Sequence, residues 1–289
     1  MASSAEIAII GGSGLYAASS IRNVQRVDVP TPFGMPSDYF SIGTMDGIPV
    51  AFLPRHGEGH RLLPSEVPSR ANLWALKSLG VRRILSVSAV GSLVEEYAPG
   101  DLVLCDQLID RTSRKDGSFF GGGVAGHVSF AQPFCADMRD RILDAARKAG
   151  QPMKARGTLV CMEGPPFSTR AESALHKDWG AQLIGMTALP EARLAREAEI
   201  CYATVAMVTD YDCWREGGEA VSVDMVVRTM RDTVGRVQAL LPGLVAALAD
   251  DGDCPCRHAA RNALMTDPAS IPYDRRRALA LLYGGYWTP

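Results

Sequence analysis

The stretch Ile7-Ala8-Ile9-Ile10-Gly11-Gly12-Ser13-Gly14-Leu15 decides between two kinds of α/β fold. An apolar strand is expected first, followed by glycines that let backbone amides approach an anion, with Ser13 as an added hydroxyl. Residues 12–17 also fit the G-x-G-x-x-A fingerprint of dinucleotide-binding folds. Those folds need a crossover helix between parallel strands, and the chain between Ala17 and strand-like residues near Val24 is too short for one. The glycine loop is therefore interpreted as a phosphate-binding turn of another α/β fold.

Outward from this loop, short apolar runs alternate with amphipathic helical segments. Strands are expected at Ile7–Ile10, Tyr39–Ile42, Val50–Leu53, Ile84–Ser88, Leu102–Cys105, Thr158–Cys161, Leu183–Met186 and Thr204–Val208. Helices are expected at Ser65–Leu79, Phe134–Ala149, Ser168–Trp179, Pro190–Glu199 and Ser222–Ala249. Several strand runs are continuously apolar, which indicates burial on both faces, whereas the short turn Met45-Asp46-Gly47 indicates an antiparallel hairpin. The predicted class is α/β, a three-layer αβα sandwich around a mixed central sheet.

Length and composition limit the possible functions. The 289 residues carry a formal net charge of −2, which argues against a nucleic-acid partner. No apolar run reaches the ~20 residues of a membrane helix, and the start lacks the features of a signal peptide, so we expect a cytoplasmic protein. Although the length alone suggests two domains, no linker divides the chain. We predict one domain over residues 1–250 and a C-terminal helical extension over 251–289.

Seven cysteines are present, and most stand singly in apolar runs, as buried free thiols do in a reducing compartment. Only Cys254 and Cys256 form a close pair. One intervening residue makes a poor zinc knuckle, and His258 alone does not complete a ligand set. We interpret the pair as two incidental thiols of the tail, with a redox-sensitive staple as the alternative, and expect no metal.

Polar or small residues follow many of the predicted strands. Segments of this kind are Arg55-His56-Gly57-Glu58-Gly59-His60, Ser88-Ala89-Val90-Gly91-Ser92, Gly164-Pro165-Pro166-Phe167-Ser168, Met186-Thr187 and Thr209-Asp210-Tyr211-Asp212. Two histidines four apart would share a helical face, but the glycines between them disfavour a helix and hence a metalloprotease site. An arginine at a strand end suits an anion, because its guanidinium is a planar fork of donors. Any one segment could be turn chemistry, but together they predict a ligand site at one edge of the sheet.

These five segments and the glycine loop, in this order, resemble the trimeric purine nucleoside phosphorylases. The stretch Thr209-Asp210-Tyr211-Asp212-Cys213-Trp214 resembles their branch of 5′-methylthioadenosine phosphorylases. The resemblance runs from about Ile7 to Ala249 and does not cover the tail. It implies phosphorolysis of S-methyl-5′-thioadenosine by inorganic phosphate, giving adenine and 5-methylthioribose 1-phosphate. It also implies a pentosyltransferase that needs no cofactor beyond its co-substrate phosphate, and a homotrimer or a dimer of trimers.

The resemblance also implies roles for individual residues. The phosphate ligands would be Ser13, Arg55, His56, the backbone of Ala89, and Thr187. The ribose and base would lie against Met186, Phe167 and Ser168. The 5′ pocket would be shaped by His60, His127, Val223 and Val226, some of them reaching a neighbouring subunit. Asp210 would be the general acid that protonates the departing purine, with Asp212 as its supporting partner.

Other functions remain open on the sequence alone. The same residues would suit a broader enzyme that acts on adenosine, inosine or guanosine, or on S-methyl-5′-thioinosine. Two hypotheses of a different class are an NAD-dependent oxidoreductase and a nucleoside-binding module without catalysis. Release of free base that depends on phosphate distinguishes the phosphorylase from both.

Overall fold

The computed structural model describes residues 4–12, 15, 20–114, 116–215, 222–249 and 252–287. The strands of this part of the chain are β1 (Ile7–Gly11), β2 (Arg22–Val27), β3 (Phe40–Met45), β4 (Ile48–Pro54), β5 (Arg83–Ser92), β6 (Leu102–Leu104), β7 (Gln107–Arg111), β8 (Thr158–Met162), β9 (Leu183–Gly185) and β10 (Cys201–Asp210). The helices are α1 (Ser69–Ser78), α2 (Ala136–Lys148), α3 (Arg170–Asp178), α4 (Ala188–Glu197), α5 (Val223–Leu248) and α6 (Tyr273–Trp287), with short 3₁₀ turns at Pro64–Glu66, Pro255–His258 and Pro268–Ser270.

One mixed sheet contains these strands in the order β2-β3-β4-β1-β5-β9-β8-β7, and β10 joins it by pairing with both β5 and β6. Neighbours β4, β1, β5 and β10 run parallel, whereas β2, β3 and β4 pair antiparallel. The predicted hairpin at Asp46 and Gly47 is confirmed, and both residues have positive φ, as its tight turn requires. Among the described residues, the next element after β1 is the edge strand β2, which pairs antiparallel with β3.

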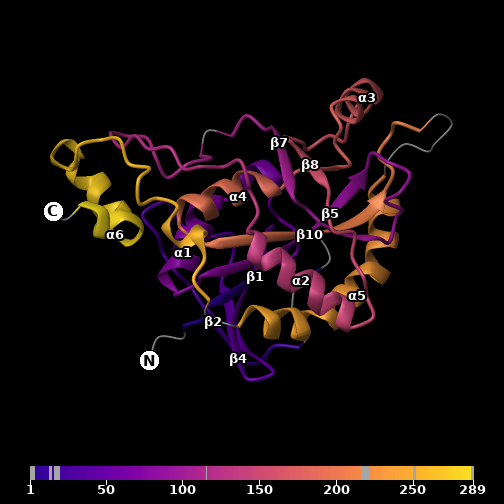
Figure 1. The fold of residues 1–289 in the computed structure, drawn as a ribbon, viewed down its shortest axis with the longest axis horizontal. Coiled ribbons are helices and arrows are strands. Elements are labelled where there is room, and N and C mark those ends of the chain that lie inside the picture. The colour runs from indigo at the N-terminus through magenta and orange to yellow at the C-terminus, as the bar shows by residue number, and fades with distance from the viewer. Residues whose placement is uncertain are drawn as a thin grey trace.

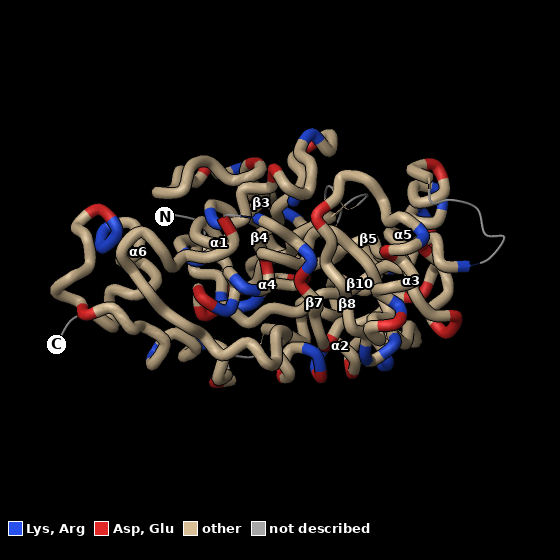
Figure 2. The backbone as a smooth tube through the Cα atoms, turned by 90° about the horizontal axis from the view of Figure 1, so that it is seen from above, with Lys and Arg blue, Asp and Glu red and all other residues tan. Residues whose placement is uncertain are grey.

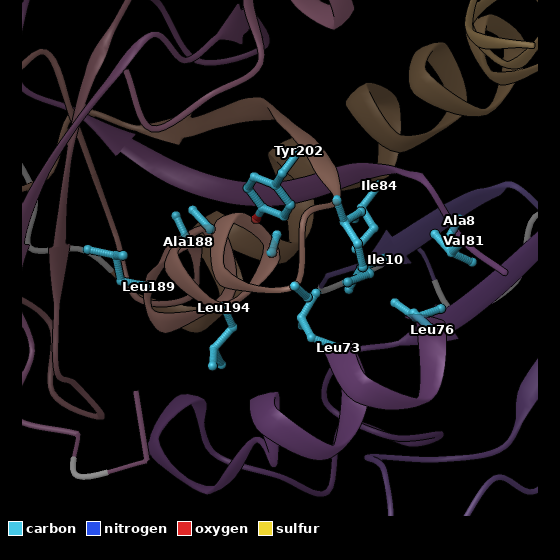
Figure 3. Close-up of a cluster of buried hydrophobic side chains, with 14 of the residues drawn as sticks. Ala8, Ile10, Leu73, Leu76, Val81, Ile84, Ala188, Leu189, Leu194 and Tyr202 are labelled. Atoms are coloured by element: carbon cyan, nitrogen blue, oxygen red, sulfur yellow. The ribbon is translucent and has the colours of Figure 1, made fainter. Parts of the chain in front are cut away.

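Helices cover both faces of the sheet, which confirms the predicted three-layer α/β sandwich (Figure 1). Helices α2 and α5 pack on one face, and α1 and α4 pack on the other. Figure 3 shows part of the hydrophobic core between the sheet and the helices α1 and α4. There, Ile10 of β1 and Tyr202 of β10 lie near Leu73 of α1 and Leu194 of α4. Strand β10 is buried along its whole length, as its continuously apolar sequence predicts.

Two strands escaped the sequence prediction. Strand β2 is polar and almost entirely exposed at the sheet edge, and β7 is half exposed. Neither presents the apolar run that identified the others. Helix α1 begins at Ser69 rather than Ser65, after a separate 3₁₀ turn. Helix α4 includes an extended Leu189, so its regular part begins at Pro190, as the sequence predicts.

The chain after α5 forms the C-terminal extension, which ends in α6 at one end of the molecule (Figure 1). Trp74 of α1 donates its indole N–H to the Ala278 carbonyl of α6, at 3.0 Å. Arg275 of α6 donates to the Phe119 carbonyl, at 2.8 Å. The extension is therefore packed on the body. No helix in the described segments has both the length and the apolar character needed to cross a membrane.

In the view of Figure 2, acidic and basic residues of the described chain are interspersed. This distribution agrees with the net charge of −2.

Candidate functional site

The sheet edge where β1, β4, β5 and β10 end carries most of the predicted site. These parallel strands deliver Gly11, Pro54, Ser92 and Asp210 to the same side, where ligands of open α/β folds bind. Strand β9 differs from that expectation, because it pairs antiparallel with the end of β5. Its own end therefore points back along β5, which brings Thr187 to Ser88.

Arg55, directly after β4, is buried and held in place before any ligand binds. Its Nε and Nη2 donate to the two carboxylate oxygens of Glu191, at 2.9 and 3.0 Å. Nη2 also donates to Ser86 Oγ at 2.6 Å, and Nη1 donates to the Val87 carbonyl at 3.2 Å. Tyr202 donates its hydroxyl to the same Glu191, at 2.7 Å. A bidentate pair of this kind fixes the guanidinium plane.

His56 follows Arg55 and faces two neighbours. Its Nδ1 donates to the Leu62 carbonyl, at 2.9 Å, and its ring stacks on His60 with centroids 4.3 Å apart. Burial and then the charge of Arg55 lower the pKa of His56 to about 4. Burial also lowers the pKa of His60. Neutral His56 with its proton on Nδ1 leaves Nε2 free as an acceptor.

Two hydroxyl groups and a glycine lie near Arg55 and His56. Ser88 Oγ and Thr187 Oγ1 are 3.1 Å apart. A Cβ at Gly12 would lie 2.8 Å from the Val87 carbonyl oxygen and 2.9 Å from Arg55 Nη1, so only glycine fits against the guanidinium. The predicted Ser13 lies outside the described residues. Ala89 follows Ser88 in β5, and the group as a whole offers donors to a small anion.

The other end of the site is acidic. Asp210, the last residue of β10, accepts the Thr209 hydroxyl at 2.7 Å and the Asp212 amide N–H at 2.8 Å. Burial raises the pKa of the Asp210 carboxyl, and the nearby charge of Asp212 adds to this, while the two hydrogen bonds oppose it. Asp212 Oδ2 is buried without a hydrogen-bond partner among the described residues, and the Asp212 backbone has φ of 49°. A protonated carboxyl here can donate to a base.

Gly91 of β5 makes room for these carboxyls. A Cβ at this position would lie 2.9 Å from Asp210 Oδ1 and 3.5 Å from Asp212 Cβ. The close approach explains why a glycine stands in this strand.

The loop between β8 and α3 carries Phe167 and Ser168. Cys213 donates its thiol to the Ser168 carbonyl at 3.3 Å, so this loop lies against the segment that bears Asp212. A Cβ at Gly164 would lie 2.6 Å from Met186 Sδ, which places Met186 against the same loop. Phe167 is 43% exposed, and its ring is free to cover a planar ligand.

Three of the predicted 5′-pocket residues are not brought to this centre by any contact in the described structure. Val223 and Val226 lie in the first turn of α5, where Val223 is 66% exposed. His127 is exposed, and its amide donates to the Ala263 carbonyl of the C-terminal extension, at 2.8 Å. That extension and α3, which follows Ser168, lie at opposite ends of the molecule (Figure 1).

Two polar residues of the site were missed by sequence reasoning. Glu191 orients Arg55, and Arg114 donates to the Met186 carbonyl at 2.7 Å and to the Leu189 carbonyl at 2.8 Å. The position of Glu191 in the otherwise apolar start of α4 was the one sequence signal that this carboxylate has a buried cationic partner. Arg114 follows a half-exposed strand and gave no signal.

The interpretation of Cys254 and Cys256 as incidental thiols stays a prediction, but the structure shows that the pair does not stand alone. Both are buried, and the structure places the distant Cys135 and Cys201 beside them. His258 instead pairs with Asp253, at 3.3 Å. The spacing of the two tail cysteines could not reveal this cluster, because Cys135 and Cys201 lie far from them along the chain.

Comparisons with known proteins agree with the geometry. Residues 6–248 match the family described as the Phosphorylase superfamily. The S-methyl-5′-thioadenosine phosphorylase of Chloroflexus aurantiacus is 52% identical over 286 residues, which cover 99% of each chain. The crystal structure of a methylthioadenosine phosphorylase from an antarctic soil metagenomic library has a TM-score of 0.91 and 46% identity, covering 97% of this chain and 99% of that one. Methylthioadenosine phosphorylase from Schistosoma mansoni in complex with adenine has a TM-score of 0.82 and 40% identity, covering 86% and 93%.

Proposed function

The chain belongs to the phosphorylase superfamily, and on that premise we propose that it cleaves S-methyl-5′-thioadenosine with inorganic phosphate. The products are adenine and 5-methylthioribose 1-phosphate. A phosphate oxygen bonds to the anomeric carbon as the bond from that carbon to the purine nitrogen breaks. The electron pair leaves with the purine, which is protonated as it departs. The protein is thus a pentosyltransferase of purine and methionine salvage.

One observation supports this reaction at this site more than any other. Arg55 donates to the Val87 carbonyl, whereas Asp210 pairs in register with Gly91, four residues further along β5. Four residues of extended strand span about 13 Å. A cationic group and a protonatable carboxyl at that separation match the two ends of a nucleoside with phosphate at its anomeric carbon.

Phosphate is bound at the Arg55 end. Arg55 and the Thr187 hydroxyl donate to its oxygens, the Ala89 amide donates from β5, and Ser13 completes the glycine loop. His56 Nε2, an acceptor in the neutral ring, takes the single O–H of the phosphate dianion. Because Glu191 holds the guanidinium rigidly, binding phosphate costs little reorganisation.

The leaving base is bound at the Asp210 end. Burial raises the pKa of Asp210, which favours its protonated form, and in that form Asp210 donates a proton to the purine ring nitrogen as negative charge develops there. Asp212 supports it, and the two carboxyls accept from the 6-amino group that adenine has and hypoxanthine lacks. Phe167 covers the base, while Ser168 and Met186 contact the ribose.

The 5′ group determines which nucleoside is preferred. We assign Val223 and Val226, which no contact in the described structure brings to the centre, to the apolar surface that meets the methylthio group beside Ser168, with few donors for a 5′-hydroxyl. Adenosine, inosine, guanosine and S-methyl-5′-thioinosine are the competing substrates, and the two carboxyls favour the 6-amino purines among them.

The site is completed by a second copy of the chain. His127 is exposed and bonded through its amide to Ala263 of the C-terminal extension, whereas Ser168 shortly precedes α3; helices α6 and α3 lie at opposite ends of the molecule (Figure 1). In a homotrimer, or a dimer of trimers, this histidine reaches the 5′ pocket of a neighbour. Light scattering coupled to size exclusion measures the number of chains.

One experiment tests the reaction. The enzyme is incubated with methylthioadenosine, adenosine or inosine, with and without phosphate, and the released bases are identified by chromatography. We expect adenine from methylthioadenosine only when phosphate is present, with 5-methylthioribose 1-phosphate formed in equal amount. Base release without phosphate indicates a hydrolase, binding without release indicates a non-catalytic module, and nicotinamide-dependent oxidation indicates an oxidoreductase. Any of these results contradicts the proposal.

A further inference from the structure

Four cysteines from three separate parts of the chain converge in the core. The sulfurs of Cys135, Cys201, Cys254 and Cys256 all lie within 4.8 Å of one another, and all four residues are buried. Cys135 precedes α2, Cys201 begins β10, and the other two belong to the C-terminal extension. The Cys135 amide donates to the Tyr202 carbonyl at 2.9 Å, which fixes it beside the start of β10.

The spacing of the sulfurs fits a shared metal ion. A tetrahedral zinc with bonds of ~2.3 Å to sulfur separates its ligand sulfurs by about 3.8 Å. The Cys135 and Cys254 sulfurs are 3.5 Å apart, close to that value. A disulfide needs about 2.05 Å between its sulfurs, so this pair is not bonded. Four thiolates with no open position are typical of structural rather than catalytic zinc.

A buried cation nearby calls for negative charge. Arg83 of β5 is the register partner of Cys201, so both side chains leave the same face of the sheet. Arg83 is only 1% exposed, and none of its three guanidinium nitrogens has a hydrogen-bond partner among the described residues. Four neutral thiols would leave this cation uncompensated, which is costly in a core. Four thiolates around a divalent ion carry a net charge of −2 and offset it.

We propose that Cys135, Cys201, Cys254 and Cys256 bind one structural Zn²⁺ that fastens the C-terminal extension to the body. On binding, each thiol releases its proton and forms one sulfur–zinc bond, so four protons leave and no redox step occurs. His258 is not a ligand, because it pairs with Asp253. The ion lies apart from the active site: Cys201 and Asp210 are at opposite ends of β10, about 30 Å along the strand.

The first test uses the native chain. The protein is purified under reducing conditions, and its bound metal is measured by inductively coupled plasma mass spectrometry. We expect one zinc per chain. Replacement by Co²⁺ gives the visible bands of tetrahedral cobalt and the near-ultraviolet thiolate-to-cobalt charge-transfer band. A reduced chain that binds neither metal overturns the proposal, as does intact-mass evidence that these cysteines form disulfides, and iron in place of zinc overturns its choice of metal.

The second test uses variants. Cys254→Ser and Cys256→Ser are expected to lose the zinc and the cobalt spectrum. Trypsin cuts the loosened extension at Arg257 or Arg261, while residual phosphorolysis shows that the body, whose substrate site lies at the other end of β10, stays folded. The matched control is Cys105→Ala, a buried cysteine outside the cluster, which keeps one zinc. Retention of full zinc content by both tail variants contradicts the proposal.

Discussion

The clearest test of the catalytic proposal replaces the general acid without changing its shape. In Asp210→Asn, the amide oxygen keeps its hydrogen bond from the Asp212 N–H, which is 2.8 Å long in the native chain. The new NH₂ group donates to Thr209 Oγ1, and that hydroxyl turns to donate to the Val90 carbonyl, 3.1 Å away. Every buried polar atom of the network keeps a partner. The variant is therefore expected to fold normally and to lack only the proton.

The magnitude follows from the role. A positioned general acid contributes a factor of roughly 10² to 10⁴, so kcat for adenine release should fall at least about 100-fold. That factor corresponds to about 2.7 kcal/mol of transition-state stabilisation. The KM for phosphate should change little, because Arg55 and Thr187 lie at the other end of the site. Initial rates with methylthioadenosine at saturating phosphate measure the effect.

The pH profile provides a second readout. Since burial raises the pKa of Asp210 and the acid acts in its protonated form, wild-type kcat should fall as pH rises through that pKa. The variant should lack this limb. A substrate with a 4-nitrophenol leaving group, which departs without protonation, should be cleaved by both enzymes at similar rates. The matched control is Asp106→Asn, a carboxylate that accepts the Gly157 amide away from the site. A variant within about threefold of wild type on methylthioadenosine refutes the assignment.

Three further predictions rest on the same geometry. Burial and the charge of Arg55 lower the pKa of His56 to about 4, so this histidine stays neutral above that pH. Between about pH 5 and 8 the KM for phosphate should therefore follow only the ionisation of phosphate. Kinetics at varied phosphate concentration that show an additional histidine titration would contradict this prediction. Glu191→Gln removes the negative charge that pairs with the buried Arg55 and should lower the free energy of unfolding, measured by urea denaturation, by about 3 kcal/mol. A loss under about 1 kcal/mol would show that the ion pair is not needed for stability. Gly91→Ala places a methyl group 2.9 Å from Asp210 Oδ1. The displaced carboxyl should reduce kcat at least about tenfold in steady-state kinetics, while circular dichroism shows an intact fold. An unchanged kcat would mean that the reaction tolerates this displacement of the carboxyl.

The fold was predictable where buried strands produce a recognisable hydrophobic pattern in the sequence. Strands covered on both faces, such as β10, read as continuous apolar runs, and the turn at Asp46 and Gly47 signalled the hairpin. Strand β2 could not be found in the same way, because an exposed edge strand has no buried face to pattern.

The site was predictable only in part, for a similar reason. Residues at strand ends, such as Arg55 and Thr187, follow recognisable segments. Their supporting partners come from remote positions: Glu191 lies 136 residues after Arg55, and Cys254 lies 119 residues after Cys135. No local pattern encodes such pairs, which only the tertiary structure reveals.

The exposed strand β2 also bears on how the molecules behave at high concentration. A free sheet edge can add a strand from another copy and start a fibril. Here the edge carries Arg22 and Arg26, and its ladder is broken by a register shift around Asn23, which has a φ of 54°. Incoming strands meet like charge and an irregular backbone. Both features disfavour the addition of a strand at this edge, and replacing both arginines with valine is expected to increase thioflavin-positive aggregation at high protein concentration.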